Sequence, residues 1–166
     1  MKLAVTDANI FIDLIKMEIL GYLFNIGIEI HTTVEILDQL NEPQRQILNQ
    51  YIQSLKVTKF TAQELQQATA MPAPAALEFP DKSVVFLALK LEASVLTGDG
   101  PLRKFCTSKH LDVRGIIWLF DTFLEQELIS YQIAIDKMKL LMSFNDRLPK
   151  NECLERLKKW EDNKDN

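Results

Sequence analysis

The chain has 166 residues, of which 47% are hydrophobic and 25% are charged, and its formal net charge at pH 7 is −4. This length and composition predict one soluble globular domain, residues 1–166, with a sizeable core. No run of about 18 apolar residues occurs, so a membrane span is not expected. Asp7 and Asp13 interrupt the apolar stretch at the N-terminus, which argues against a secretory signal.

The charge is unevenly distributed along the chain. Residues 1–100 hold 7 Lys and Arg against 12 Asp and Glu, whereas residues 101–166 hold 12 against 11. The negative net charge alone does not favour nucleic acid, because phosphate binding usually requires a basic surface. An acidic half that binds divalent cations, beside a half with basic faces, is nevertheless compatible with a polyanionic substrate.

The cysteines give information about the compartment. Cys106 and Cys153 lie far apart and form no CxxC pair. This spacing favours two small buried or half-buried thiols in a reduced, cytoplasmic setting.

The chain begins with an apolar run of strand type, residues 3–5, and helix-type spacing follows from residue 9. A strand that leads directly into a helix places the residues at its end in the crevice where open α/β sheets bind ligands. Asp7 occupies that position. Because an acid there is costly unless something positive meets it, Asp7 is a candidate metal or substrate ligand.

Short strands then alternate with helices. The remaining predicted strands cover residues 28–31, 55–60, 94–97 and 111–113. The predicted helices cover residues 9–14, 18–24, 34–40, 43–51, 62–70, 82–91, 102–108, 116–127, 130–142 and 150–160. Thr61 and Glu64 form a capping box in front of the helix over 62–70. The alternation predicts an α/β fold with a mostly parallel sheet of four or five short strands and extra C-terminal helices.

Acids recur at the ends of these elements. Asp7 ends the first strand, Asp99 follows the strand over 94–97, and Asp81 opens the helix that leads into that strand, where an acid suits the positive helix end. The helix after the second strand offers a fourth acid, Glu35 or Asp38, which are three residues apart and share a helix face.

Converging carboxylates without His or Cys partners suit a hard divalent cation. Mg²⁺ and Mn²⁺ prefer oxygen ligands, and Mg²⁺ is typically held by a few carboxylates, several waters and substrate phosphate. Such a site can activate a water and stabilise in-line displacement at phosphorus. Without a metal, the same cluster repels itself.

Each acid also has an ordinary structural explanation. Asp7 and Asp81 are good helix N-caps, and Asp99 in Gly-Asp-Gly-Pro fits simple turn chemistry. Glu35 and Asp38 fit a solvated helix face. The joint placement of the acids, rather than any one of them, favours the functional interpretation.

Several stretches resemble the PIN-domain family, in particular small stand-alone prokaryotic VapC-type toxins. They are VTDANIFIDL, the acid-bearing helix after the second strand, PDKSVVFLALKLEASVLTGDGPLRKF and VRGIIWLFDTFLEQELIS. The resemblance covers nearly the whole chain. Its most specific part combines Asp-x-Asn-x-Phe/Ile near the start with Asp…Ala…Leu-Thr-Gly-Asp later.

This resemblance implies a PIN-like three-layer α/β/α fold, an acidic Mg²⁺ or Mn²⁺ site and metal-dependent endonucleolytic cleavage of RNA. Carried over by residue, Asp7 matches the first acid, with Asn9 as its polar supporter. Asp81 matches the acid before the long apolar helix. Asp99 matches the acid of the Thr-Gly-Asp turn, where Thr97 supports the site through its hydroxyl.

The second acid departs from the family pattern, which usually has Glu followed by an aliphatic residue. Counting from the end of the second strand favours Asp38 as the fourth catalytic and metal-binding acid. Asp38 is followed by Gln39, and Glu35 is its competitor.

Two basic residues follow the last acid. Arg103 and Lys104, one turn after Asp99, either contact substrate phosphate or form a solvated helix face. His31 and His110 are expected to be structural or exposed, so a metal-bound water is the expected nucleophile.

The C-terminal helices, over about 116–160, are expected to pack on the same domain. One apolar stripe favours ordinary core: Ile116, Leu119, Phe120, Phe123, Leu124 and Leu128. Ile117 and Trp118 add apolar surface off this stripe, which suggests a homodimer contact or a groove for an antitoxin helix, as the resemblance predicts. The basic residues over 145–160 face RNA or solvent equally well.

The leading hypothesis is a metal-dependent ribonuclease, the toxin of a toxin–antitoxin pair. The alternative is a non-catalytic PIN-like module that binds RNA or a protein without cutting. A nucleotide-binding regulator of Rossmann type is weakly supported, since the sequence has neither GxGxxG nor a P-loop.

Overall fold

The computed structural model describes residues 1–165 and contains five strands and ten helices within that range. The strands are β1 (Leu3–Thr6), β2 (Glu29–Thr33), β3 (Leu55–Thr58), β4 (Ser94–Leu96) and β5 (Val113–Arg114). The helices are α1 (Ala8–Lys16), α2 (Leu20–Leu23), α3 (Val34–Leu37), α4 (Glu42–Asn49), α5 (Ala62–Ala70), α6 (Phe79–Leu91), α7 (Gly100–Ser108), α8 (Ile116–Glu125), α9 (Tyr131–Phe144) and α10 (Lys150–Asn163). Over residues 1–165, every helix is too short or too polar to cross a bilayer.

The five strands form one sheet in the order β3-β2-β1-β4-β5, and every neighbouring pair is parallel. This confirms the α/β fold with a parallel sheet. The chain moves outward from β1 through β2 to β3 and then returns to β4 on the other side of β1. The neighbours β1 and β4 therefore form the topological switch point, where open α/β sheets bind ligands beyond the strand ends.

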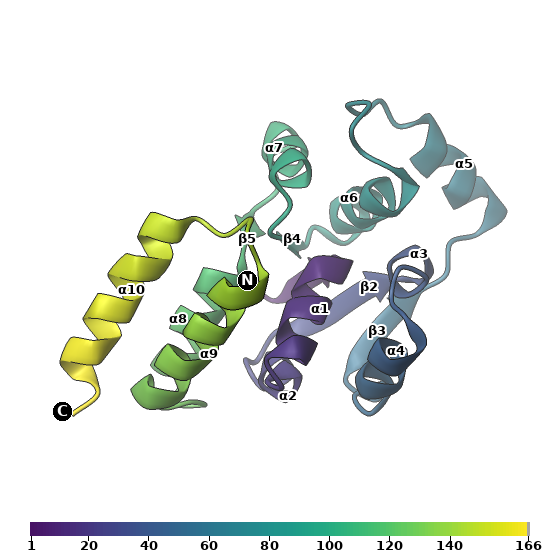
Figure 1. Ribbon diagram of the computed structural model, residues 1–166. Helices are drawn as coiled ribbons and strands as arrows, with labels where there is room; N and C mark the ends of the chain where they lie inside the picture. The colour runs from purple at the N-terminus through teal and green to yellow at the C-terminus, as the bar shows by residue number, and fades with distance from the viewer. Residues whose placement is uncertain (166) are drawn as a thin grey trace.

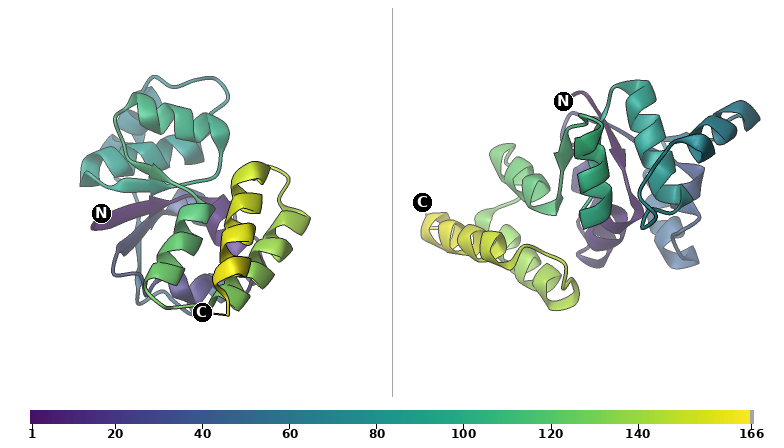
Figure 2. Two further views of the ribbon diagram at one scale, coloured as in Figure 1. Left: turned by 90° about the vertical axis from the view of Figure 1, so that its left-hand side faces the viewer. Right: turned by 90° about the horizontal axis from the view of Figure 1, so that it is seen from above.

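Helices cover both faces of the sheet, so the fold has three layers. Helices α6 and α7 lie on one side, and α1, α2 and α4 lie on the other (Figure 1). Helices α8, α9 and α10 extend this arrangement beside α1, on the opposite side of it from α3 and α4, and the last two form a hairpin (Figures 1 and 2).

The apolar core runs from the first strand to the last helix. The buried residues form one cluster that extends from Ala4 to Trp160. Trp160 on α10 packs against Phe120 on α8 with ring centroids 5.6 Å apart. The predicted stripe on α8 is part of this core, because Ile116, Leu119, Phe120 and Phe123 are buried and Leu124 and Leu128 pack against the cluster.

Local capping signals account for several helix starts. Thr61 Oγ1 accepts a hydrogen bond from Glu64 N at 3.2 Å, and Glu64 Oε1 accepts one from Thr61 N at 3.1 Å. The predicted capping box is therefore confirmed, and α5 has the predicted bounds. Asn41 and Gln44 form a second box at α4, with Pro43 in its first turn.

Thr61→Ala should lower the free energy of unfolding by about 1 kcal/mol, because it removes the acceptor for one backbone N–H at the start of α5. Urea denaturation followed by circular dichroism measures this difference. The matched control is Thr69→Ala on the same helix, whose hydroxyl donates to the Leu65 carbonyl and caps nothing. Equal losses in the two variants would contradict the capping explanation.

Most helix boundaries differ from the prediction by a few residues, and two of the predicted helices are single turns. The helix predicted over 18–24 is the single turn α2, since Glu18 adopts a positive φ of 59° and separates α2 from α1. The helix predicted through residue 40 ends as α3 at Leu37. In both cases the apolar spacing continues past the helix because the following turns also bury apolar side chains, such as Leu40.

Candidate functional site

Asp7 lies at the end of β1 and is only 3% exposed. Its backbone N–H donates to the Leu96 carbonyl of β4 at 3.1 Å, which joins the two strands at the switch point. Its Oδ1 accepts from Ile10 N at 3.1 Å and so caps α1. Its Oδ2 accepts from the Thr97 hydroxyl. The carboxylate is therefore held at a fixed place between β1 and β4.

Thr97 connects Asp7 to Asp99. The same hydroxyl that donates to Asp7 accepts a hydrogen bond from the Asp99 backbone N–H at 3.1 Å. Asp99 Oδ2 in turn accepts from Leu102 N at 2.9 Å and caps α7. The supporting position predicted for Thr97 thus corresponds to a buried hydroxyl between two of the predicted acids.

Asp81 is the third residue of α6, and its Oδ2 accepts from the Glu78 backbone N–H at 3.1 Å. The predicted start at residue 82 was three residues late, because the helix begins at Phe79 and includes Pro80 in its first turn. Asp81 is half-buried.

The charges of Asp81 and Asp99 both act on the buried Asp7. Burial raises the pKa of Asp7 to about 7; the hydrogen bonds from Thr97 and Ile10 oppose this shift, and the charges of Asp81 and Asp99 add to it. Burial also raises the pKa of Asp81; its hydrogen bond from Glu78 opposes this, and the charge of Asp99 adds to it. Three carboxylates from separate parts of the chain therefore lie within range of each other's charge.

All three acids have a structural role at a helix start. Each carboxylate uses one oxygen to accept from a backbone N–H at a helix start. Three helix N-termini thus point their positive ends at the acidic cluster, which offsets part of the mutual repulsion. The second oxygens, Oδ1 of Asp81 and Oδ1 of Asp99, are not used by the caps.

The donor set suits a hard cation. Within residues 1–165, no group of three His, Cys, Asp or Glu side chains is placed so that it could hold a metal ion. Mg²⁺ does not need one, since it is commonly bound through one or two carboxylates together with waters and substrate phosphate. The second oxygens of Asp81 and Asp99, beside the buried Asp7, fit that kind of water-rich site.

The two candidates for the fourth acid differ in burial. Asp38 lies just after α3 and is exposed. Glu35 lies in the first turn of α3 and is half-buried, and its Oε2 is buried with no hydrogen-bond partner among the described residues. Neither acid appears among the charges that shift the pKa of Asp7 or Asp81. Counting from the end of the second strand favours Asp38 as the fourth acid, whereas the buried carboxylate oxygen favours Glu35.

A groove of about 880 Å³, here called the C-terminal groove, lies between the α/β core and the C-terminal helices. Asn9 and Arg103 line it. Arg103 Nη1 donates to the Thr97 carbonyl at 2.9 Å. Lys104 is exposed and is not among the residues that line the groove. Of the two predicted phosphate ligands, Arg103 alone faces the groove.

The histidines lie where a structural role is expected. His31 is in β2, with Nε2 2.6 Å from Glu29 Oε1. His110 is exposed after α7. Both cysteines are free and buried, as predicted. Burial raises the pKa of Cys106 to about 12, so that thiol stays protonated.

Helix α8 offers less surface to a partner than the sequence suggests. Ile117, predicted to lie off the core stripe, is buried. Trp118 is half-buried and lines the C-terminal groove. The apolar surface predicted here for a second copy or an antitoxin helix is therefore mostly used within the chain.

Two residues that line the C-terminal groove were not predicted from the sequence. Arg147, in the loop between α9 and α10, places Nη1 4.0 Å from Asp99 Oδ1. Asn145 in the same loop donates from Nδ2 to Asp13 Oδ2 on α1 at 2.9 Å. The basic content of residues 145–160 was a signal for this segment, but it did not single out Arg147.

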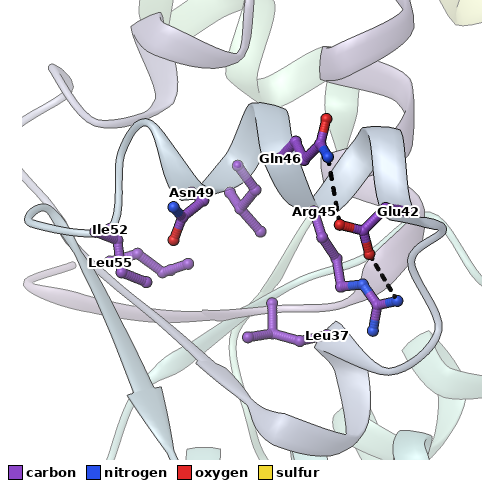
Figure 3. Close-up of a pocket in the computed structure, with 8 residues that line it drawn as sticks. Leu37, Glu42, Arg45, Gln46, Asn49, Ile52 and Leu55 are labelled. Atoms are coloured by element: carbon purple, nitrogen blue, oxygen red, sulfur yellow. Dashed lines mark hydrogen bonds and ion pairs between the residues drawn. The ribbon is translucent and has the colours of Figure 1, made fainter.

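A second pocket, of about 310 Å³, lies among α3, α4 and β3 (Figure 3). Glu42 at its rim pairs with Arg45 and Gln46 at 3.4 Å each. Strand β2 separates β3 from β1 in the sheet. This pocket is therefore not part of the acidic cluster, and its charged groups neutralise each other.

Comparisons with known proteins agree with the fold. The chain resembles a PilT N-terminus domain protein from the hyperthermophilic archaeon Sulfolobus solfataricus P2, at 17% identity over 74% of this chain and 94% of that chain, with a TM-score of 0.51. It also resembles VapBC2 from Rickettsia felis, solved bound to a DNA fragment from its promoter, at 14% identity over 68% of this chain and 98% of that chain, with a TM-score of 0.47. A search of curated proteins found no match.

A family model supplies the assignment. The model of DUF3368, described as a PIN domain, matches residues 3–162, which is nearly the whole chain. The matched span includes all three coupled acids and the C-terminal helices. This chain belongs to the PIN-domain family DUF3368.

Proposed function

We propose that this protein is a divalent-metal-dependent endoribonuclease that hydrolyses RNA phosphodiester bonds. The observation that supports the proposal is that Asp7, at the switch point between β1 and β4, lies within range of the charges of Asp81 and Asp99. Membership of the PIN-domain family supports nuclease chemistry in general.

In this proposal the chain's own residues hold and orient the reacting groups. Asp81 and Asp99 offer their second oxygens to a Mg²⁺ or Mn²⁺ ion, and Asp7 lies beside them, held by Thr97. When bound, the ion supplies positive charge to the phosphate and lowers the pKa of a water. Arg103, tied to the Thr97 carbonyl, orients the substrate phosphate.

The direct test is incubation of the purified protein with labelled RNA and Mn²⁺ or Mg²⁺, with and without EDTA. We expect cleavage products only with the free metal ion. Cleavage of equal extent in EDTA would contradict the metal dependence.

The fourth acid can be assigned by two matched variants. We expect Glu35→Gln to lower the cleavage rate about tenfold, because a buried carboxylate oxygen without a partner is costly unless a cation or water meets it. Asp38→Asn should stay within about twofold of the parent, since surface changes away from a site are usually small. A reversed order in single-turnover kinetics would assign Asp38 instead.

The partners and location form part of the proposal. We propose that the protein acts in the cytoplasm as the toxin of a toxin–antitoxin pair, with an antitoxin protein as partner, and that it forms a homodimer. Size-exclusion chromatography with light scattering tests the dimer. Co-expression with a neighbouring small DNA-binding protein tests the antitoxin.

A second candidate function is a non-catalytic PIN-like module that binds RNA or a protein without cutting. It is favoured by one observation, that within residues 1–165 no group of three His, Cys, Asp or Glu side chains is placed so that it could hold a metal ion. RNA binding without any metal-dependent cleavage would support it.

A further inference from the structure

The C-terminal groove holds several cations, most of which are committed to other groups. Arg156 forms a two-pronged pair with Asp121, with Nε and Nη2 2.8–3.1 Å from the carboxylate. Lys16 lies over the Phe144 ring at 5.1 Å from its centroid. Arg147 differs from these, since its side chain is 75% exposed and its ion pair with Asp99 is 4.0 Å long.

One side chain fixes the loop that carries Arg147. Asn145 Nδ2 donates to Asp13 Oδ2 on α1 at 2.9 Å, and Asn145 Oδ1 accepts from the Arg147 backbone N–H at 2.9 Å. The amide thus joins α1 to the backbone of Arg147. Burial raises the pKa of Asp13, while the hydrogen bond from Asn145 and the charges of Lys16 and Arg147 lower it. The loop is therefore set before any ligand arrives.

The guanidinium of Arg147 is available to a ligand. It lies near Asp99 Oδ1, the oxygen that does not cap α7. An exposed ion pair at this distance contributes little to stability, so it does not lock the site. A guanidinium has five donors in a planar fork that matches a phosphate.

A second arginine, Arg103, lines the same groove. Arg103 Nη1 donates to the Thr97 carbonyl, and a Cβ at Gly115 would lie only 3.2 Å from that nitrogen. The absence of a side chain at Gly115 therefore leaves room for the guanidinium. One arginine from α7 and one from the α9–α10 loop thus line the C-terminal groove.

We propose that Arg147 is a substrate-binding residue that holds an RNA phosphate next to the one at the acidic cluster, and that Asn145 and Asp13 are positioning residues for it. This inference rests on the proposed ribonuclease function. The inference goes beyond that function because it assigns a role in substrate binding to the α9–α10 loop. This loop lies 40 or more residues after Asp99, the last acid of the cluster.

The test measures binding of fluorescently labelled single-stranded RNA by anisotropy at several KCl concentrations. All variants carry Asp7→Asn, so that RNA is not cut. Arg147→Gln should weaken binding about tenfold, as expected for loss of a charged hydrogen bond. It should also lower the slope of log Kd against log salt by about 0.7, the value for one phosphate contact on a single strand. Arg147→Lys should restore part of the lost affinity and part of the lost salt slope.

The positioning residues have their own matched variants. Asn145→Ala should reproduce about half of the free-energy effect of Arg147→Gln, or about threefold in Kd. Asp13→Ala should do the same, whereas Asp13→Asn keeps an acceptor for Asn145 and should bind as the parent does. Arg45→Gln, which removes an exposed arginine at the pocket of Figure 3, controls for lost charge and should leave the affinity within about twofold.

Other outcomes would contradict the role of Arg147, the positioning role of Asn145 or the ribonuclease function. Parent-like RNA binding by Arg147→Gln overturns it, and so does tighter Mn²⁺ binding with unchanged RNA affinity, which would make Arg147 a restraint on Asp99. Parent-like binding by Asn145→Ala overturns the positioning role. If the protein with native Asp7 fails to cleave RNA while Arg147→Gln still weakens binding, the ribonuclease proposal fails and the Arg147 assignment stands.

Discussion

Asp7→Asn should lower the rate of metal-dependent RNA cleavage by about 10³-fold, equivalent to about 4 kcal/mol of transition-state stabilisation. The substitution removes a negative charge from the place where β1 and β4 meet. The side chain keeps its shape, and an amide oxygen can still accept from Ile10 N and cap α1. The fold should therefore be retained, which circular dichroism checks, while single-turnover cleavage measures the loss.

The control for this prediction is Asp136→Asn, which removes an exposed carboxylate on α9 that accepts from Gln132. Its cleavage rate should match that of the parent. The double variant Asp7→Asn/Asp99→Asn should be at least as inactive as the single one. If the parent and the double variant cleave RNA alike, the nuclease proposal is wrong.

The free energy of unfolding of the metal-free protein should fall as the pH rises from about 4 to about 7. In the unfolded chain Asp7 ionises around its ordinary pKa of 3.8, whereas burial raises the pKa to about 7 in the folded protein. Below both values the carboxyl is protonated in both states and contributes nothing. Between them only the unfolded state releases the proton, so unfolding becomes more favourable. Above pH 7 the loss is complete and constant, at about 4 kcal/mol at most.

Urea denaturation in EDTA at a series of pH values measures this effect. The difference between the parent and Asp7→Asn isolates Asp7, because Asp13 and Asp81 also have raised pKa values and add a slope of the same sign. We expect the variant to be the more stable protein at pH 8 and to lose this advantage toward pH 4. Parallel curves for the two proteins would contradict the raised pKa of Asp7 in the folded protein.

Local patterns in the sequence predicted the elements and the places of Asp7, Asp81 and Asp99 at their ends. The capping box at Thr61 and the apolar run of β1 depend on neighbouring residues, so spacing was sufficient to predict them. Asp7 and Asp99 follow two parallel strands, and the carboxyl ends of such strands meet at one edge of the sheet. The prediction that they lie together therefore needed only the fold class.

The tertiary structure alone decided which groups are buried and what they meet. Spacing puts Glu35 and Asp38 on one helix face, but α3 is a single turn, and packing buries one oxygen of Glu35 while Asp38 stays in solvent. Likewise, Arg147 is an ordinary basic residue in sequence, but in the fold it lies 4.0 Å from Asp99, and Asn145 in the same loop contacts Asp13, 132 positions away. Side-chain chemistry and short spacings are written in the sequence, whereas burial, pKa and long-range contact arise only when distant segments pack.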